Sequence, residues 1–224
     1  MTIAEPITSL TDLIVALLCF YYYGIFKKNN PNQTAYEWPY FFLFLGIATS
    51  MGAINHAFLT NHEQITYRMM WLDMQLVSGL TSWCAVIATV RTFITNSDLI
   101  SSIKKWSFFY LFFYAVAVLY FQDFKVVVIN NVICLIPVML IHFFHPRRRP
   151  EHKWIALGLL VNCGAAVVFA TKFTIHPVWC THNDLAHVII GCGVWVTSLT
   201  LDLPNPPKEG IRDLPNPPKE GTRR

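Results

Sequence analysis

The chain has 224 residues, of which 54% are hydrophobic and only 13% are charged. A soluble globular domain usually carries about 25% charged residues, so this composition excludes an ordinary water-soluble domain. Long apolar stretches separate the few charged clusters, and each approaches the roughly 20 residues needed to cross a hydrocarbon core about 30 Å thick. The sequence therefore predicts an all-α, multi-pass integral membrane protein whose residues 1–201 form one membrane domain.

Seven apolar segments follow one another along the chain, and each predicts one transmembrane helix of a seven-helix bundle. No basic region precedes the first segment and no small-residue cleavage site follows it, so we expect it to be retained. The fourth and fifth segments meet so closely, around Gln122 and Asp123, that one interrupted helix would give the same pattern. The predicted spans are Thr8 to Phe26, Pro39 to Leu59, Met69 to Val90, Trp106 to Phe121, Phe124 to Phe144, Trp154 to Phe173 and Asn183 to Leu201.

Basic residues are divided unevenly between the two sides of this predicted bundle. Of the 17 Lys and Arg residues, only Arg68, Lys125 and Lys172 fall on one side, and the rest fall on the other side or in the tail. Connectors rich in Lys and Arg stay in the cytoplasm. We therefore predict that the N-terminus lies outside and the C-terminus lies in the cytoplasm.

The composition changes after Leu201, where the segment DLPNPPKEG occurs twice, beginning at Asp202 and at Asp213. Its prolines and charges cannot build a packed core, so residues 202–224 are predicted to form a disordered, polyproline-rich tail. Two interpretations stay open for this tail. It is either a binding segment for a cytoplasmic partner or a remnant of cloning.

Ionisable side chains inside the predicted spans indicate where a functional site lies. Each costs at least a few kcal/mol in a membrane unless it is paired, hydrated or bound to a metal. His56 lies near the end of the second span, Asp73 near the start of the third, and Asp184 and His187 near the start of the seventh. The predicted orientation brings all four toward the outer leaflet, where Asp12 of the first span would join them.

Neutral imidazoles and carboxylates are good zinc ligands, and a catalytic zinc keeps one coordination position open for water. We interpret His56 and His187 as zinc ligands and Asp73 as the general base. The third ligand is left open. Asp184 shares a helical face with His187 and ranks first, and His182 ranks second.

For other polar residues the sequence gives weaker reasons to place them in this site. His62, in the connector after the second span, is a further donor. Asp12 alone also suits the positive end of a helix, and any single intramembrane histidine can be a packing residue that hydrogen-bonds to a neighbouring helix. His142 and His145 precede the sequence HPRRRP, and we interpret them as interfacial residues.

At these positions the chain resembles the CREST superfamily of seven-span membrane proteins. That group includes alkaline ceramidases, the progestin and adipoQ receptors, and Per1-like lipid-remodelling proteins. His56 and Asp73 match the second-span histidine and third-span aspartate of the family, and His187 matches the second histidine of its terminal pair. The resemblance implies that the histidines bind zinc and that the aspartate supports catalysis.

Two positions depart from the family pattern. Gly52 stands where the family has a serine, although Ser50 lies two residues earlier, and Asn183 stands in place of the first terminal histidine. We expect Ser50, Asn183 and Asp12 to support the ligands or contact the substrate. The resemblance therefore covers the architecture and three positions.

The leading hypothesis from the sequence is a zinc-dependent intramembrane hydrolase of a lipid amide or ester, similar to a ceramidase. Its substrate would be a membrane lipid, and we expect no nucleic-acid partner. The alternative is a non-enzymatic membrane receptor or scaffold with a structural metal site. A retinal protein is disfavoured because the seventh span has no lysine to form a Schiff base.

Overall fold

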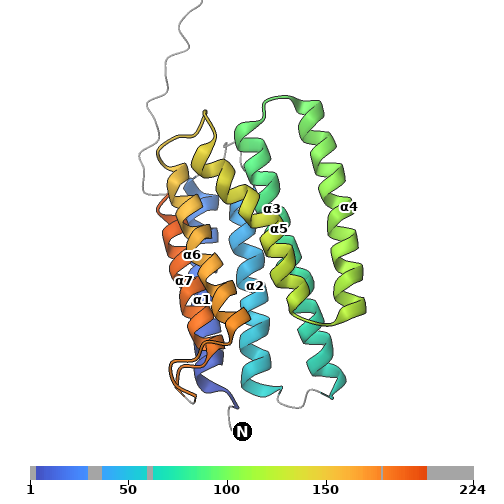
Figure 1. Cartoon of the computed structure of the whole chain (residues 1–224), viewed down its shortest axis with the longest axis vertical. Helices are drawn as coiled ribbons and strands as arrows, with labels where there is room; N and C mark the ends of the chain where they lie inside the picture. The colour runs from blue at the N-terminus through green and yellow to red at the C-terminus, as the bar shows by residue number, and fades with distance from the viewer. Residues whose placement is uncertain (1–3, 30–36, 60–62, 178, 201–224) are drawn as a thin grey trace, which may run out of the picture.

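The computed structural model describes residues 4–29, 37–59, 63–177 and 179–200 (Figure 1). The predicted tail after Leu201 and the candidate donor His62 lie outside these ranges. Seven helices make up most of the described chain, as predicted. They are α1 (Pro6–Asn29), α2 (Glu37–Phe58), α3 (Ile65–Phe93), α4 (Ser97–Phe121), α5 (Lys125–Phe144), α6 (His152–Thr171) and α7 (His182–Ser198).

Successive helices run up and down through the molecule, so the connections fall alternately at two ends of one bundle (Figure 1). We call the end at which α1, α3, α5 and α7 begin the amino end. We call the opposite end the basic end because nine of the described Lys and Arg residues lie there. These are Lys27, Lys28, Arg91, Lys104, Lys105, Arg147, Arg148, Arg149 and Lys153.

Six helices form a closed ring, and the seventh lies outside it. Around the ring α1 contacts α2, α2 contacts α3, α3 contacts α5, α5 contacts α6, α6 contacts α7, and α7 returns to α1. Helix α4 packs mainly on α3 and has little contact with α5, so it stands apart from the other helices (Figure 1). Tyr114 and Val118 are its only described buried residues.

Six of the described helices, α1 to α6, are long and apolar enough to cross a bilayer. Many of their large apolar side chains are exposed on the outside of the bundle, among them Phe112 and Phe113 of α4 and Val167 of α6. Such side chains are compatible with a surrounding of lipid rather than water. Helix α7 has 17 residues and is about 26 Å long, so it falls slightly short of the other six.

The fourth and fifth helices are separate, which answers the question that the sequence left open. Gln122 adopts a left-handed conformation with φ of 52° and ends α4. Asp123 then accepts hydrogen bonds from the backbone nitrogen and the ammonium group of Lys125, at 2.9 and 3.0 Å. Both bonds stabilise the ionised carboxylate and hold the pKa of Asp123 below its ordinary value, and the backbone hydrogen bond has the larger effect.

Helix α4 begins nine residues before the predicted span, at Ser97 rather than Trp106. The Asn96 side chain caps this start by accepting hydrogen bonds from the backbone nitrogens of Asp98 and Leu99. The added turns are rich in polar residues, so the hydropathy of the sequence does not predict them as part of the helix. Hydropathy detects the part of a helix that suits the membrane, whereas the cap determines where the helix starts.

Glycines allow α6 and α7 to approach closely. A Cβ atom placed on Gly158 would lie 2.6 Å from the carbonyl oxygen of Gly193 and 2.8 Å from the backbone nitrogen of Thr197. Small residues at such contacts are a common means of packing helices within membranes, where lipid offers no hydrophobic drive between them. The position of α7, and so of its polar first turns, depends on this contact.

Gly158→Ala is therefore expected to destabilise the protein, because the added methyl group meets backbone atoms that cannot move independently. We expect a loss of about 1–3 kcal/mol, as for other overpacked sites, and a lower midpoint of thermal unfolding in detergent. Gly164→Ala on the same helix is the matched control, since its Cβ would meet only Ile189 Cγ2 at 3.7 Å. Equal midpoints for the two variants would contradict this account of the α6–α7 contact.

Candidate functional site

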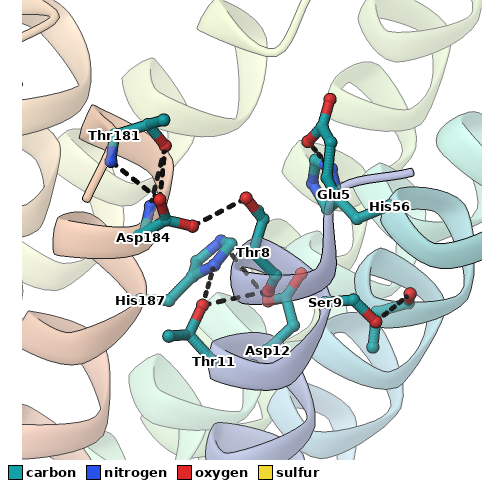
Figure 2. A network of polar contacts seen from close by, with 10 residues as sticks. Glu5, Thr8, Ser9, Thr11, Asp12, His56, Thr181, Asp184 and His187 are labelled. Atoms are coloured by element: carbon teal, nitrogen blue, oxygen red, sulfur yellow. Dashed lines mark hydrogen bonds and ion pairs between the residues drawn. The ribbon is translucent and has the colours of Figure 1, made fainter. Parts of the chain in front are cut away.

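Polar side chains from three helices meet at the amino end of the bundle (Figure 2). Asp12 from α1 and Asp184 from α7 are each only 3% exposed, although both are acidic residues in membrane-compatible helices. His187 of α7 and His56 of α2 lie beside them, with ring centroids 6.3 Å apart. Four of the residues singled out in the sequence are thus brought to one place.

His187 contacts α1 through both ring nitrogens. Its Nε2 lies 3.3 Å from Asp12 Oδ1, and its Nδ1 lies 3.3 Å from Thr11 Oγ1. The Thr11 hydroxyl donates its hydrogen to the carbonyl oxygen of Thr8, at 2.9 Å. Two hydrogen-bond patterns fit these contacts: either His187 Nδ1 donates to the Thr11 oxygen, or Nε2 donates to Asp12 Oδ1 and the Thr11 hydroxyl donates to Nδ1.

The first of these patterns leaves an unusual pair of atoms. In a neutral imidazole that carries its proton on Nδ1, Nε2 has only a lone pair. An ionised Asp12 carboxylate also offers only lone pairs, so two acceptors face each other at 3.3 Å. A cation between them, either a proton or a metal ion, is needed to make this contact favourable.

The distance between these two atoms also suits a metal ion. Nitrogen and oxygen ligands lie about 2.0–2.2 Å from zinc, so two ligands at neighbouring corners of a tetrahedron are about 3.3–3.5 Å apart. The observed separation of His187 Nε2 and Asp12 Oδ1 is 3.3 Å. This distance therefore suits two neighbouring zinc ligands, as it also suits a hydrogen bond between the two groups.

His56 is held in a similar way by a residue that precedes α1. Its Nδ1 lies 2.7 Å from Glu5 Oε2, and its carbonyl oxygen accepts a hydrogen bond from the Glu5 backbone nitrogen at 3.1 Å. Since a carboxylate accepts, Nδ1 is again the donor, and no described residue hydrogen-bonds to Nε2. Metal-binding histidines typically have this arrangement, with one ring nitrogen held by a carboxylate or another acceptor.

Gly52 makes room for the Asp12 carboxylate. A Cβ atom placed on Gly52 would lie 2.6 Å from Asp12 Oδ2, so a larger residue at this position would force the carboxylate to move. One helical turn along, Ser9 of α1 donates a hydrogen bond to the carbonyl oxygen of Ala53 at 2.9 Å. The position at which the sequence departs from the family serine is thus filled by the carboxylate of another helix.

Asp184 has a structural role in this arrangement. Its Oδ2 accepts hydrogen bonds from the backbone nitrogen and hydroxyl of Thr181, at 2.7 and 2.8 Å, which forms the capping box that starts α7. Its Oδ1 accepts a hydrogen bond of 2.6 Å from the Thr8 hydroxyl of α1. Both oxygens are occupied, so Asp12 is better placed than Asp184 to be the third metal ligand.

Other predicted site residues lie apart from this group. The His182 ring lies against Phe169 in a tilted arrangement, with centroids 6.0 Å apart, and the Ser50 hydroxyl donates to the carbonyl oxygen of Gly46 at 2.8 Å. Asn183 is half-buried in the first turn of α7. None of the three has a described hydrogen bond to His56 or His187.

Asp73 is exposed on α3 and makes no described hydrogen bond to either histidine. Helix α3 has 29 residues and is about 44 Å long, roughly 14 Å more than the hydrocarbon core. If Arg91 lies at one edge of that core, Asp73 lies close to the other edge, where water can reach a carboxylate. Its predicted role as general base stays a prediction.

In the described part of the chain no three His, Cys, Asp or Glu side chains are already placed around one metal position. His187 and Asp12 form two corners of such a site, and His56 would have to turn its Nε2 toward them to form the third. Thr8, Thr11 and Glu5 hold this group together, and sequence reasoning missed all three. The spacing of Thr8, Thr11 and Asp12, which puts them on one helical face, was the available signal.

A second histidine cluster lies at the basic end. His142 is fully buried, with its Nε2 3.2 Å from Thr89 Oγ1, and its ring centroid lies 5.2 Å from that of His152 and 5.1 Å from that of Phe93. The interpretation of His142 as an interfacial residue is wrong, because α5 turns this side chain into the bundle. Its neighbour His145 is half-buried and contacts Phe93 from the helix end.

Thr8→Val is expected to destabilise the protein, because it leaves one oxygen of the buried Asp184 carboxylate without a donor while keeping the side-chain shape. We expect a loss of about 1–3 kcal/mol, measured as a lower midpoint of thermal unfolding in detergent. Thr171→Val is the control, since Thr171 is exposed and hydrogen-bonds only within its own helix. An unchanged midpoint for Thr8→Val would show that this contact does not hold α1 against α7.

Comparison with known proteins gives one match. Residues 7–202 match a family described as a family of unknown function, DUF6962. No curated protein and no solved structure matches the chain. The match does not bear on the resemblance to the CREST superfamily, which stays a prediction.

Proposed function

The chain belongs to DUF6962, a family of unknown function, and from the geometry of its buried polar site we propose that it is a zinc-dependent hydrolase of a membrane lipid amide or ester. His187, Asp12 and His56 are the proposed protein ligands. The proposal keeps the two histidines expected from the sequence and replaces Asp184 by Asp12 as the third ligand. His182 becomes a packing residue.

One observation carries this proposal. His187 Nε2 and Asp12 Oδ1 face each other at 3.3 Å, a separation at which a single cation, either a proton or a metal ion, can join them. Both groups are nearly buried, with side-chain exposures of 17% and 4%. A pair of acceptors in a low-dielectric interior is costly unless a cation joins them, and their separation matches neighbouring ligands of tetrahedral zinc.

The residues around the ligands would fix their orientation. Glu5 holds His56 Nδ1, and the Thr11 oxygen would hold His187 Nδ1, which would leave both Nε2 atoms available to the metal. Asp184 anchors the first turn of α7 to Thr8 of α1. When bound, zinc would polarise a carbonyl group and lower the pKa of water toward neutrality.

The substrate would reach this site from the bilayer. Apolar side chains next to the ligands are exposed on all three helices, including Leu13 of α1, Ile54 of α2 and Val188 of α7, at 45%, 43% and 51%. A lipid lying against these helices would place its amide or ester near the membrane surface, at the depth of His56 and His187. The proposal keeps Asp73 as the proton acceptor on the sequence argument alone, since its exposed carboxylate makes no described hydrogen bond to either histidine.

We further propose that α7 also spans the membrane, with the N-terminus outside and the C-terminus in the cytoplasm. The concentration of Lys and Arg at the basic end supports this orientation. The close packing of α7 between α6 and α1 supports a membrane position for it as well. The proposed hydrolase site would then face the outer leaflet.

Elemental analysis of the purified protein is the direct test of the metal site. We expect about one zinc per chain in the wild type and at least a tenfold loss in His187→Gln and in Asp12→Asn, because each change removes a ligand. His182→Gln is the matched control and should keep its zinc. Retention of zinc by both ligand variants would refute the assignment of the ligands. A wild type without zinc would refute the metal site, and the cation between His187 and Asp12 would then be a shared proton.

Hydrolysis is tested separately with fluorescent ceramide and fluorescent phospholipid in detergent micelles. We expect Asp73→Ala to keep its zinc and to lose at least about a hundredfold in kcat, the usual contribution of a general base. A zinc-containing wild type that cleaves neither lipid would favour the alternative, a receptor or scaffold with a structural metal. Loss of zinc from Asp73→Ala would instead make Asp73 a ligand.

A further inference from the structure

A cavity of about 270 Å³ lies between α3, α4 and α5, helices that carry none of the three proposed metal ligands. It exists because α4 packs on α3 and hardly touches α5 (Figure 1). The opening therefore faces sideways, toward the surroundings of the bundle. Ile133 of α5 lines this cavity and is 52% exposed, which marks its mouth.

The dimensions of the cavity suit a single alkyl chain. Its lining runs from Gly79 to Val90 on α3 and from Asn130 to Ile141 on α5. The eleven residue-to-residue steps in each of these stretches correspond to about 16 Å, which is close to half of a hydrocarbon core about 30 Å thick. The cavity thus runs along the helices for about the depth of one leaflet.

The chemistry of the lining also favours an apolar occupant. The residues that line the cavity include no charged side chain, and most are apolar. The polar lining groups already have partners. The Ser107 hydroxyl accepts from Trp83 Nε1 at 3.0 Å and donates to a backbone carbonyl, Asn130 Nδ2 donates to Ser82 Oγ at 3.1 Å, and Thr89 donates to a carbonyl oxygen of its own helix.

The end of the cavity nearest the basic end carries a marker of the membrane surface and a positive charge. Trp106, beside the lining residue Ser107, is 72% exposed, and tryptophans of this kind gather at the level of lipid headgroups. Lys104 lies one turn before Ser107 on the same helical face and is exposed. No described acidic side chain pairs with Lys104.

We propose that this cavity binds one acyl chain of an anionic phospholipid whose phosphate lies at Lys104. The apolar lining accommodates the chain, and the lysine selects the headgroup, since basic residues at a membrane surface attract anionic lipids. The second chain of the same lipid lies along the exposed aromatic face of α4, which includes Phe108 and Phe112. This proposal does not rest on the hydrolase proposal, because the two sites share no residue.

The test is native mass spectrometry of the full chain with phosphatidylglycerol and phosphatidylcholine that carry the same palmitoyl and oleoyl chains. We expect one retained phosphatidylglycerol per protein, favoured at least fivefold over phosphatidylcholine. Val86→Phe, which fills the cavity, should reduce retention at least fivefold. Val167→Phe on the exposed face of α6 is the matched control and should retain lipid like the wild type.

The headgroup assignment has its own pair of variants. Lys104→Gln should remove the preference for phosphatidylglycerol, whereas Lys28→Gln, an equal loss of charge at the same end of the bundle, should preserve it. If Val86→Phe does not fold, Ile133→Phe at the exposed mouth replaces it. Three results would overturn the proposal. They are undiminished lipid retention in the folded cavity variant, an unchanged preference for phosphatidylglycerol in Lys104→Gln, and retention of sodium oleate in place of both phospholipids.

Discussion

A buried carboxylate in a membrane-compatible helix must find a cation or hydrogen-bond donors, and this constraint organises the amino end of the bundle. Asp12 is almost completely enclosed by α1, α2 and α7, and the atom that it meets is Nε2 of His187. Gly52 leaves space for the carboxylate beside α2, and Thr11 contacts the other ring nitrogen of the histidine. Asp184 satisfies the same constraint differently, because it obtains its donors from Thr8 and from the start of its own helix.

The bundle separates two kinds of chemistry. Helices α1, α2 and α7 bring ionisable groups together at the amino end, where any substrate would have to approach from the membrane surface. Helices α3, α4 and α5 leave an apolar cavity whose polar lining groups are already hydrogen-bonded. Glycines in the close contact between α6 and α7 let the ring close, and that closure brings the first turns of α7 against α1. A lipid site and a polar site can therefore coexist without sharing side chains.

Hydropathy predicted the seven helices because an apolar segment that crosses lipid must satisfy its backbone hydrogen bonds internally. A helix does so within the segment itself. Hydropathy failed at the start of α4, where the Asn96 cap and polar turns extend the helix beyond the apolar run. Spacing and predicted depth brought His56 and His187 together correctly, but they could not show which carboxylate faces His187. That choice depends on the rotation of α1 and on the space left by Gly52, which are properties of packing. The burial of His142 was missed for the same reason, since helix rotation is not encoded by position along a span.

The central claim is that Asp12 and His187 interact directly across the α1–α7 contact. A double-mutant cycle with Asp12→Asn and His187→Gln measures that interaction by itself, when the free energy of unfolding is followed in detergent with a metal chelator so that only a proton can join the two groups. The account predicts a coupling free energy of about 1 kcal/mol or more, within the range for residues in contact. Additive effects of the two substitutions, with no measurable coupling, would contradict it.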